Sequence, residues 1–458
     1  MGQDAADTII KGEDIKTEDP VKSAKRVTKI LKDKEKVDLI VCLSHCGTVT
    51  EGDSEDEILA SKVPAIDVII SGHSHTTLTE PIIKDNTIIG SAGPNGQHAG
   101  IIELQIKSGQ RPQLVDYRLQ KISPETPVIP AINEQINIFK NMANDQLLAR
   151  YGLTYNQIVA ESAFNLESPE TMENPVETGL GNLIADAFRH AVREAEGPKG
   201  EYVHAAVIPQ GEIRSSFTAG PLDVNDVFQV LSLGQGFDQT TGYPLVTFYL
   251  TSKEIKSCLE VQSSIAPTDP KYNLQVSGVK FKYNMSRLRF DRVYDIEIST
   301  PDGKFEAIEP NKLYRVSTTY YTAAMISSLR EKTYKLLSAI PKNSDGLPIE
   351  DLSTALVDAD PSQTGVQELK GWKTLTDFLA TQQDVNSNGI PDIPDKYIKP
   401  AGSYTEINSA HLGDLLRDAT IITWGAYFIV AVLAIVCGFL ARRLIPKGQK
   451  RKKWKRRR

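Results

Sequence analysis

The stretch Ile66-Asp67-Val68-Ile69-Ile70-Ser71-Gly72-His73-Ser74-His75-Thr76 places two histidines directly after a run of apolar residues. The apolar residues follow one another without alternation, which is typical of a strand that is buried on both faces. A similar run occupies residues 38–43, and residues 54–62 between the two runs have the pattern of a short helix. This order of strand, helix and strand predicts an α/β layer.

A third histidine follows the earlier strand, because His45 lies in Leu43-Ser44-His45-Cys46-Gly47. Ligands of α/β sheets bind at the carboxyl ends of the strands, where His45, His73 and His75 are all expected. A lone histidine is more often a hydrogen-bonded structural residue. Three imidazoles at neighbouring strand ends instead favour a site for a transition metal such as Zn, Mn, Fe or Co.

Residues 37–76 resemble the later half of the calcineurin-type metallophosphoesterase domain of the 5'-nucleotidase family, on the motifs Leu-Ser-His-x-Gly and Gly-His-Ser-His. The resemblance implies a metal-dependent phosphoric ester hydrolase with a small phosphorylated substrate. It also implies that His45 and His73 bind one metal and that His75 approaches a second.

The motifs that the family carries before this point are not found. They are Asp-x-His, Gly-Asp and Gly-Asn-His, and they supply the bridging aspartate, further ligands and the catalytic histidine. None of the seven histidines has an aspartate two positions before it, and Gly52-Asp53 follows His45 instead of preceding it. Since a two-metal site needs anionic ligands, we expect an N-terminally truncated domain with one weakly held metal, an unknown catalytic residue and little or no activity. The strand at residues 38–43 is expected to lie at an unpaired sheet edge.

Three segments further along the chain resemble the substrate-binding C-terminal domain of the same family: residues 177–187, 211–214 and 274–278. The resemblance implies that Gly211 and Arg214 hold the phosphate of the substrate and that Tyr321 stacks on a nucleobase. Arginine suits this role because it binds phosphate oxygens through two parallel hydrogen bonds. A surface ion pair for Arg214 and a core position for Tyr321 remain open alternatives.

Other positions depart from the pattern of the family. Pro209 and Gln210 replace the Asn and the first Gly of its phosphate loop, and Leu233 stands where a second stacking ring is expected. Residues 323–326 lack the ribose-binding Gly-Gly-Asp-Gly. We therefore expect nucleoside 5'-monophosphates to bind poorly. A non-catalytic, membrane-anchored ligand-binding module is the alternative to a hydrolase.

A short segment near the end of this domain has the spacing of a calcium loop. Oxygen-bearing side chains alternate along it and Gly389 allows a sharp turn, as a hard cation requires. The candidate Ca²⁺ ligands are Asp384, Asn386, Asn388, Asp392 and Asp395. A turn rich in Asx residues has the same composition without a bound ion.

Residues 421–441 carry no charge and are long enough to cross a bilayer as a helix. Residues 442–458 follow at once and hold eleven Lys or Arg. The positive-inside rule places this tail in the cytoplasm and the body on the periplasmic or extracellular side. Residues 1–7 contain no apolar signal segment, so that either the body faces the cytoplasm or the N-terminus is missing from the sequence.

Charge and cysteine content argue against two other classes of protein. The net charge of −6 becomes −17 when the eleven cations of the tail are left out, and an acidic body does not suggest a nucleic-acid-binding protein. The four cysteines are too few and too scattered for a disulfide framework or a zinc cage.

The sequence thus predicts an α/β partial metallophosphoesterase sandwich, an α+β domain and one transmembrane helix. The expected segments are the partial metallophosphoesterase domain at 1–107, a proline-rich linker with a connecting helix at 108–153, the substrate-binding domain at 154–400, a juxtamembrane segment at 401–420, the transmembrane helix at 421–441 and the basic tail at 442–458.

Overall fold

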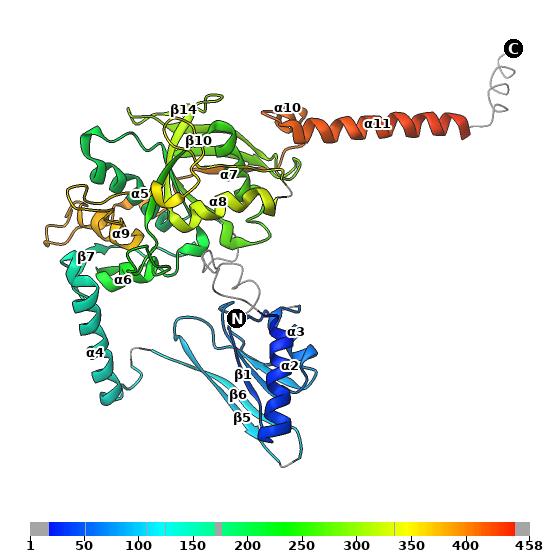
Figure 1. The fold of residues 1–458 in the computed structure, drawn as a ribbon, viewed down its shortest axis with the longest axis vertical. Coiled ribbons are helices and arrows are strands. Elements are labelled where there is room, and N and C mark those ends of the chain that lie inside the picture. Colours follow the sequence, from blue (N-terminus) through cyan, green and yellow to red (C-terminus); the bar gives the residue numbers. More distant parts are fainter. Residues whose placement is uncertain are drawn as a thin grey trace. The chain divides into compact units, whose positions relative to one another are not determined.

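The computed structural model describes residues 18–50, 52–107, 109–123, 125–169, 176–333 and 335–444. The chain divides into two compact parts, residues 1–136 and 137–458, which we call unit 1 and unit 2 (Figure 1). Separate clusters of buried apolar side chains lie within each unit, so each is described by itself.

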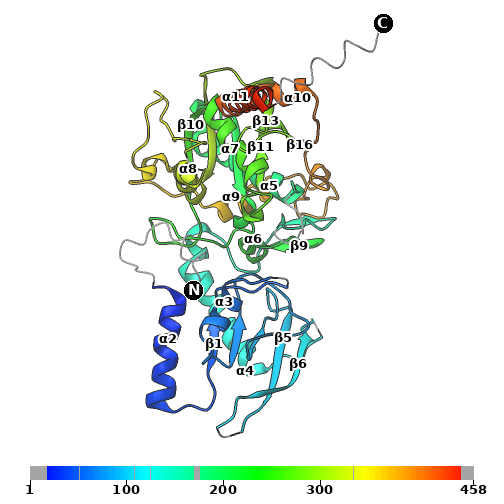
Figure 2. The ribbon, with the colours of Figure 1, turned by 90° about the vertical axis from the view of Figure 1, so that its right-hand side faces the viewer.

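The sheet of unit 1 has the strand order β1-β2-β4-β3. Its strands are β1 (Val41–Ser44), β2 (Val68–Ser71), β3 (Ile82–Lys84) and β4 (Thr87–Gly90). The first, second and fourth run parallel, and β3 is antiparallel to β4. The helices α2 (Pro20–Ile30) and α3 (Glu55–Lys62) share a core with the sheet that contains Leu59, Ile69 and Ile89. The predicted order of strand, helix and strand is therefore present in unit 1 (Figure 2).

The strand β1 lies at the edge of this sheet. Within the described residues its one partner is β2, and the register runs from Val41 opposite Val68 to Ser44 opposite Ser71. Leu43 is 82% exposed, although its neighbours along the chain belong to an apolar run. The expected unpaired edge is therefore present in the part of the sheet that the structure describes.

The predicted linker at 108–153 is wrong in its first part. Residues 113–121 form β6 (Gln113–Lys121), which pairs with β5 (His98–Gln105) in an antiparallel hairpin. The prolines that suggested a linker flank the strand, so that none of them interrupts its hydrogen bonds. The hairpin packs on the sheet, because Ile102 and Tyr117 lie directly against Gly90 of β4, and the Tyr117 hydroxyl donates to the Leu78 carbonyl at 2.9 Å. The predicted connecting helix is α4 (Pro130–Gln146).

The described residues of unit 2 form two four-stranded sheets and one two-stranded sheet. The first has the order β10-β15-β8-β11, the second β14-β13-β12-β16, and the third pairs β7 with β9. The strands are β7 (Ile158–Ser162), β8 (Ala205–Pro209), β9 (Gly220–Asp223), β10 (Leu245–Thr251), β11 (Leu274–Ser277), β12 (Val279–Asn284), β13 (Val293–Ser299), β14 (Phe305–Ala307), β15 (Leu313–Thr319) and β16 (Tyr404–Ile407). The longer helices are α5 (Gly179–Glu196), α7 (Ser252–Ser264), α8 (Tyr320–Lys332) and α9 (Gly371–Ala380).

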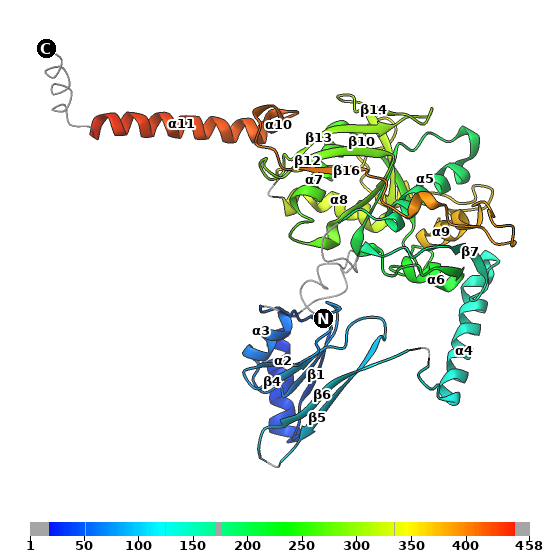
Figure 3. The same ribbon diagram turned by 180° about the vertical axis from the view of Figure 1, so that it is seen from behind.

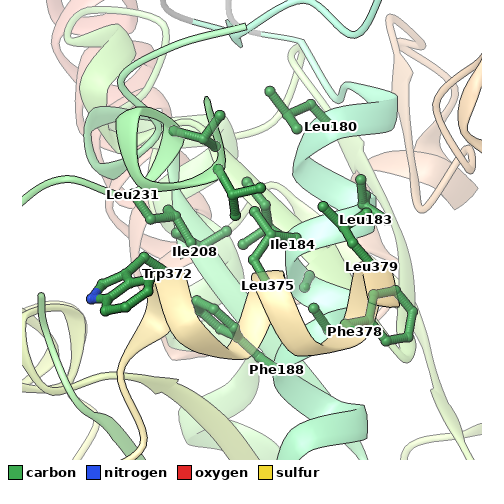
Figure 4. Packing of buried hydrophobic residues seen from close by; sticks show 14 of the residues in the cluster. Leu180, Leu183, Ile184, Phe188, Ile208, Leu231, Trp372, Leu375, Phe378 and Leu379 are labelled. Carbon is green, nitrogen blue, oxygen red and sulfur yellow. The ribbon is translucent and has the colours of Figure 1, made fainter. Parts of the chain in front are cut away.

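The main core of unit 2 lies between α5 and α9. Leu183, Ile184 and Phe188 of α5 are fully buried and meet Trp372 and Leu375 of α9 (Figure 4). The apolar residues of α5 recur every three or four positions, so they form one face of the helix. Burying each such side chain contributes about 1.5–3 kcal/mol, which explains why this helix is nearly all buried along its first two turns.

The N-terminal end of α5 approaches its neighbours unusually closely. A Cβ atom at Gly179 would lie 1.8 Å from the Tyr397 carbonyl oxygen, and one at Gly181 would lie 2.1 Å from the Gln275 side-chain oxygen. Thr178 caps the helix by accepting a hydrogen bond from the Gly181 N–H at 3.0 Å. Both glycines are therefore required by space, and not by backbone conformation.

A buried polar cluster joins this helix end to two distant segments. The Asn182 amide donates to Glu177 at 2.8 Å and to the Val276 carbonyl at 3.0 Å. Its oxygen accepts from the Ala401 N–H at 2.9 Å, and Glu177 accepts from the Ser403 N–H at 2.9 Å. The cluster thereby fixes α5, β11 and the chain that leads into β16.

The predicted juxtamembrane segment at 401–420 is structured. It contains β16, which runs parallel to β12 in the second sheet, and the short helix α10 (Leu412–Leu416) (Figure 3). The long helix α11 (Ile421–Leu444) follows, and residues 421–439 within it are long and apolar enough to cross a membrane. Most of the predicted basic tail, residues 445–458, lies outside the described residues.

Candidate functional site

His45 and His73 follow the last residues of two neighbouring parallel strands. Ser44 ends β1, Ser71 ends β2, and the two serines are register partners. The two histidines therefore lie side by side, with ring centroids 4.9 Å apart and ring planes tilted by 58°. Both residues are exposed, so the pair is accessible to a ligand from solvent.

A buried carboxyl group fixes the ends of the two strands. Asp56 of α3 is fully buried and accepts hydrogen bonds from the hydroxyls of Ser44 at 2.5 Å and Ser71 at 2.6 Å. Burial raises the pKa of Asp56 above its usual range. One side chain holds both serines. The distance between the starting points of the loops that carry His45 and His73 is therefore fixed.

A second set of hydrogen bonds joins the two histidine loops beyond the strands. The Thr48 N–H donates to the Ser74 hydroxyl at 3.0 Å, and the hydroxyls of Ser74 and Thr76 donate to the Thr48 carbonyl at 2.7 and 2.6 Å. Gly47 adopts φ +102° directly beside Ser74, where a side chain would be strained. The glycine after His45 therefore allows the close approach of the two loops.

The residues present fit one metal ion better than two. Two adjacent neutral imidazoles suit a transition metal. Among the described residues, no group of three His, Cys, Asp or Glu side chains is arranged to hold a metal ion, so His75 does not complete such a group. The nearby carboxyl groups of Asp56 and Glu57 accept hydrogen bonds from hydroxyls instead. Metal ligation by His45, His73 and His75 stays a prediction.

The predicted phosphate loop of unit 2 follows β8. Gly211 packs against Lys271, whose Cβ would lie 3.1 Å from a Cβ added to the glycine. Arg214 is half-buried, and its guanidinium donates to the Gly211 carbonyl at 3.3 Å while its N–H donates to the Val230 carbonyl at 2.9 Å. The structure therefore brings Gly211 and Arg214 together in one loop. Phosphate binding by this loop stays a prediction.

Tyr321 lies against a second aromatic ring that the sequence did not indicate. The rings of Tyr243 and Tyr321 are stacked, with centroids 5.1 Å apart and planes tilted by 24°. Burial raises the pKa of the Tyr321 hydroxyl to about 12. Two rings that contact each other directly have centroids about 4.5–7 Å apart, and a base between them would need about twice that separation. Tyr243 therefore covers one face of the Tyr321 ring, and a base can stack on that face only if the two rings separate.

A small cavity adjoins this tyrosine pair and contains Leu233, the residue expected to replace a stacking ring. The space inside this cavity that a water molecule can reach is about 10 Å³, which is room for about one water. Its walls are formed by Phe188, Glu212, Leu231, Leu233, Tyr243, Thr319 and Gly371. The cavity is therefore too small for a substrate in this conformation.

Glu212 is a further group that the sequence did not single out. Its carboxyl group is buried and accepts hydrogen bonds from the hydroxyls of Thr319, at 3.0 Å, and Thr322. Burial raises the pKa of Glu212 to about 7. It occupies the variable position of the loop between Gly211 and Ile213, so no motif drew attention to it.

The predicted calcium loop forms a compact turn. Asp384 accepts from the N–H groups of Asn388 at 3.1 Å and Gly389 at 2.8 Å, and Asp392 accepts from the Val385 N–H at 2.7 Å. Glu161 of β7 accepts from the Asn388 amide at 2.9 Å and also from Asn386. Asp395 begins a short 3₁₀ helix after this turn. These contacts are those of an Asx-rich turn, and calcium binding stays a prediction.

Unit 2 matches a known protein family. The family described as the 5'-nucleotidase C-terminal domain matches residues 158–326, which contain α5, Gly211, Arg214 and Tyr321. The match therefore covers the segments that carry the phosphate loop and the stacked tyrosines.

Similar proteins include curated relatives and solved structures. The trifunctional nucleotide phosphoesterase protein YfkN of Bacillus subtilis (strain 168) is 27% identical over 327 residues, which are 70% of this chain and 21% of that protein. The apyrase of Tabanus yao is 26% identical over 334 residues, 67% of this chain and 56% of the apyrase. The chain thus spans about half the length of these relatives or less. The crystal structure of a 5'-nucleotidase precursor from Thermus thermophilus shares the fold, with a TM-score of 0.58 at 22% identity over 86% of this chain and 68% of that chain.

We expect Glu212 to make the stability of unit 2 depend on pH. A carboxyl group whose pKa rises from 4.5 to about 7 on folding stabilises the fold below pH 4.5 and loses this contribution as the pH rises to about 7. The free energy of unfolding of the wild type should therefore fall relative to Glu212→Gln across this window, by about 3 kcal/mol. Urea unfolding followed by tryptophan fluorescence measures it, because Trp372 is buried in the core of unit 2.

Glu297→Gln, at an exposed position of β13, is the matched control and should keep the pH dependence of the wild type. If the free energy of unfolding of the wild type and of Glu212→Gln changes with pH in parallel, the pKa of Glu212 is the same in the folded and the unfolded chain, which would contradict this prediction.

Proposed function

Because the chain belongs to the 5'-nucleotidase family, we propose that it is a metal-dependent phosphoric ester hydrolase whose substrate is a nucleotide or a related small phosphate ester. The observation that carries the proposal is the pair of imidazoles, 4.9 Å apart, at the carboxyl ends of two parallel strands. The phosphate loop of unit 2 supports it, since Arg214 and Gly211 lie in one loop that matches the C-terminal domain of the family.

The two units have different tasks in this proposal. His45 and His73 hold a transition metal, which activates water and stabilises charge on the phosphoryl oxygens when it is bound. Arg214 binds phosphate oxygens through its planar guanidinium, and the loop backbone at Gly211 lies close enough to contact the same group. Asp56 positions the histidines through Ser44 and Ser71 without contacting the substrate.

A membrane-anchored ligand-binding module without catalytic activity is the second candidate. The observation that favours it is the lack of a three-ligand metal group among the described residues. Both candidates share the substrate-binding unit 2, so metal content and turnover separate them.

We expect the purified chain to bind at most one transition metal and to hydrolyse phosphate esters slowly. Two cations about 3.5–4 Å apart repel one another unless anionic ligands lie between them, and Asp56 and Glu57 are occupied by hydroxyl donors. Elemental analysis gives the number of metals per chain, and assays with added manganese or zinc give the turnover. His73→Ala should reduce metal content and turnover together.

His98→Ala is the matched control for this test, because His98 lies in the hairpin strand β5 and not at a strand end of the parallel sheet. A content near two metals per chain with fast turnover would contradict the expected single site. Wild-type turnover without bound metal would contradict the metal-dependent mechanism itself.

We expect AMP to bind weakly, because a base cannot enter between Tyr243 and Tyr321 without separating their rings. Stacking on an aromatic ring contributes about 1–3 kcal/mol per base, so its loss reduces affinity by roughly 5- to 150-fold. Calorimetric titration with AMP and with ribose 5-phosphate should give similar affinities for the two. Arg214→Ala should weaken both, while Arg193→Ala on the exposed face of α5 should change neither. A low-micromolar dissociation constant for AMP alone would show that the tyrosines separate and hold the base.

The helix α11 is proposed to anchor the chain in a membrane, with the body on the periplasmic or extracellular side and the tail in the cytoplasm. The charge step at Arg442 supports this orientation through the positive-inside rule. Protease added to intact cells or spheroplasts should digest the body and leave a tag on the tail intact. Protection of the body would reverse the topology, and digestion of both parts would argue against a membrane span.

A further inference from the structure

The chain that leads from β16 to the helix α11 is bonded to the rest of unit 2 at several points. The strand β16 pairs with β12, and the Met285 N–H donates to the Ile407 carbonyl at 2.9 Å. Asn284 and Ser409 then exchange two backbone-to-side-chain hydrogen bonds, at 2.8 and 3.2 Å. The segment that precedes α11 is therefore an integral part of the second sheet, and not a free linker.

The first turn of α11 is held by one buried carboxylate. Asp291 is fully buried and accepts hydrogen bonds from the Thr420 N–H at 2.8 Å and the Thr423 hydroxyl at 2.5 Å. An anionic group at the N-terminal end of a helix satisfies free N–H groups and interacts favourably with the helix dipole. Hydrogen bonds and nearby cations hold the pKa of Asp291 below its usual range, against the effect of its burial.

Two cations complete this connection. Lys256 of α7 lies 3.0 Å from Asp291 and donates to the Asp418 carbonyl at 2.7 Å. Arg287 lies 3.6 Å from Asp291 and donates to the Arg417 carbonyl at 2.7 Å. Each cation thus binds both Asp291 and the backbone just before α11. Removing one member of a buried ion cluster leaves uncompensated charge, so each member contributes to the stability of this connection.

The turn between β12 and β13 is brought to the base of α11 by the same contacts. This turn, residues 285–290, presents Leu288, which is 36% exposed, and the exposed Arg289. The Arg289 guanidinium donates to the Ser264 carbonyl at 2.6 Å, and the Phe290 N–H donates to the Ser264 hydroxyl at 2.9 Å. The turn is therefore held in place on the end of α7.

The short helix α10 lies next to the start of α11 in all three ribbon views (Figures 1, 2 and 3). Its Leu412 is exposed, and Trp424 in the first turn of α11 is 54% exposed. Apolar side chains beside an arginine and a tryptophan are typical of a surface that meets the lipid headgroups.

We propose that residues 285–290 and α10, together called the membrane-facing patch, rest on the lipid headgroup layer and that Asp291 holds them there by capping the anchor. The proposal rests on the membrane span proposed for α11. Leu288 and Leu412 enter the interface and Arg289 contacts lipid phosphates. Two leucines alone bind a bilayer weakly, but the anchor keeps them beside it, so that a weak contact is populated. The substrate-binding unit is thereby held in one orientation on the membrane.

The test uses the full chain reconstituted in phosphatidylcholine vesicles, with and without phosphatidylglycerol. Leu288→Cys carries an environment-sensitive fluorophore, and lipids with a nitroxide headgroup quench it. Val385→Cys is the matched control, because Val385 is also an exposed apolar residue but lies in the turn after α9. We expect quenching at residue 288 to be at least roughly threefold stronger than at residue 385, as for a group in the headgroup layer.

Asp291→Asn should reduce quenching at residue 288 towards the value for residue 385. Thr423→Val removes a single hydrogen bond and should reduce it partly, which keeps the test valid if Asp291→Asn does not fold. Quenching of Trp424 by brominated lipids, assigned with Trp424→Phe, reports whether α11 is inserted at all. Insertion with equal quenching at residues 288 and 385 overturns the membrane-facing patch alone. Lack of Trp424 quenching overturns the anchor and the patch together.

Discussion

The close packing of the N-terminal end of α5 against β11 is the constraint on which unit 2 depends. Gly179 and Gly181 leave room for the Tyr397 carbonyl and for Gln275, where any side chain would collide. The contact lets Asn182 and Glu177 bond to β11 and to residues 401–403 within one buried cluster. From this cluster the chain continues as β16 and then reaches α11. The phosphate loop after β8 and the proposed anchor are therefore attached to the same rigid scaffold.

Unit 1 is organised around Asp56 in a comparable way. A single buried carboxyl group receives the hydroxyls that end β1 and β2, and it thereby determines the separation of His45 and His73. The same geometry limits the chemistry, because a carboxyl group that is occupied by two serines is not available to bridge metal ions. The arrangement explains why the exposed imidazole pair is well positioned although the carboxyl group beside it is not free to bind a metal ion.

The sequence predicted the features that depend on local pattern. The apolar run ending in Ser71-Gly72-His73 predicted both the parallel strand and the position of the histidine, because strand ends and turns follow from nearby residues. Long-range contacts were not predictable in this way. Tyr243 meets Tyr321 across 78 positions, Asp56 was hidden among the acidic residues that begin a short helix, and Glu212 occupies a variable motif position. The strand β6 was missed because its flanking prolines suggested a linker, although a strand needs only that no proline lies inside it.

The edge strand β1 has a consequence for the behaviour of the polypeptide in solution. Among the described residues β1 has a strand on one side only, and such an edge beside a protruding leucine is a template onto which another extended segment can add. Natural sheets avoid this by placing lysine, proline or a bulge at the edge, and β1, with the sequence Val-Cys-Leu-Ser, has none of them. The edge of β1 is therefore a place where unit 1 can pair with another chain, however stable its core is.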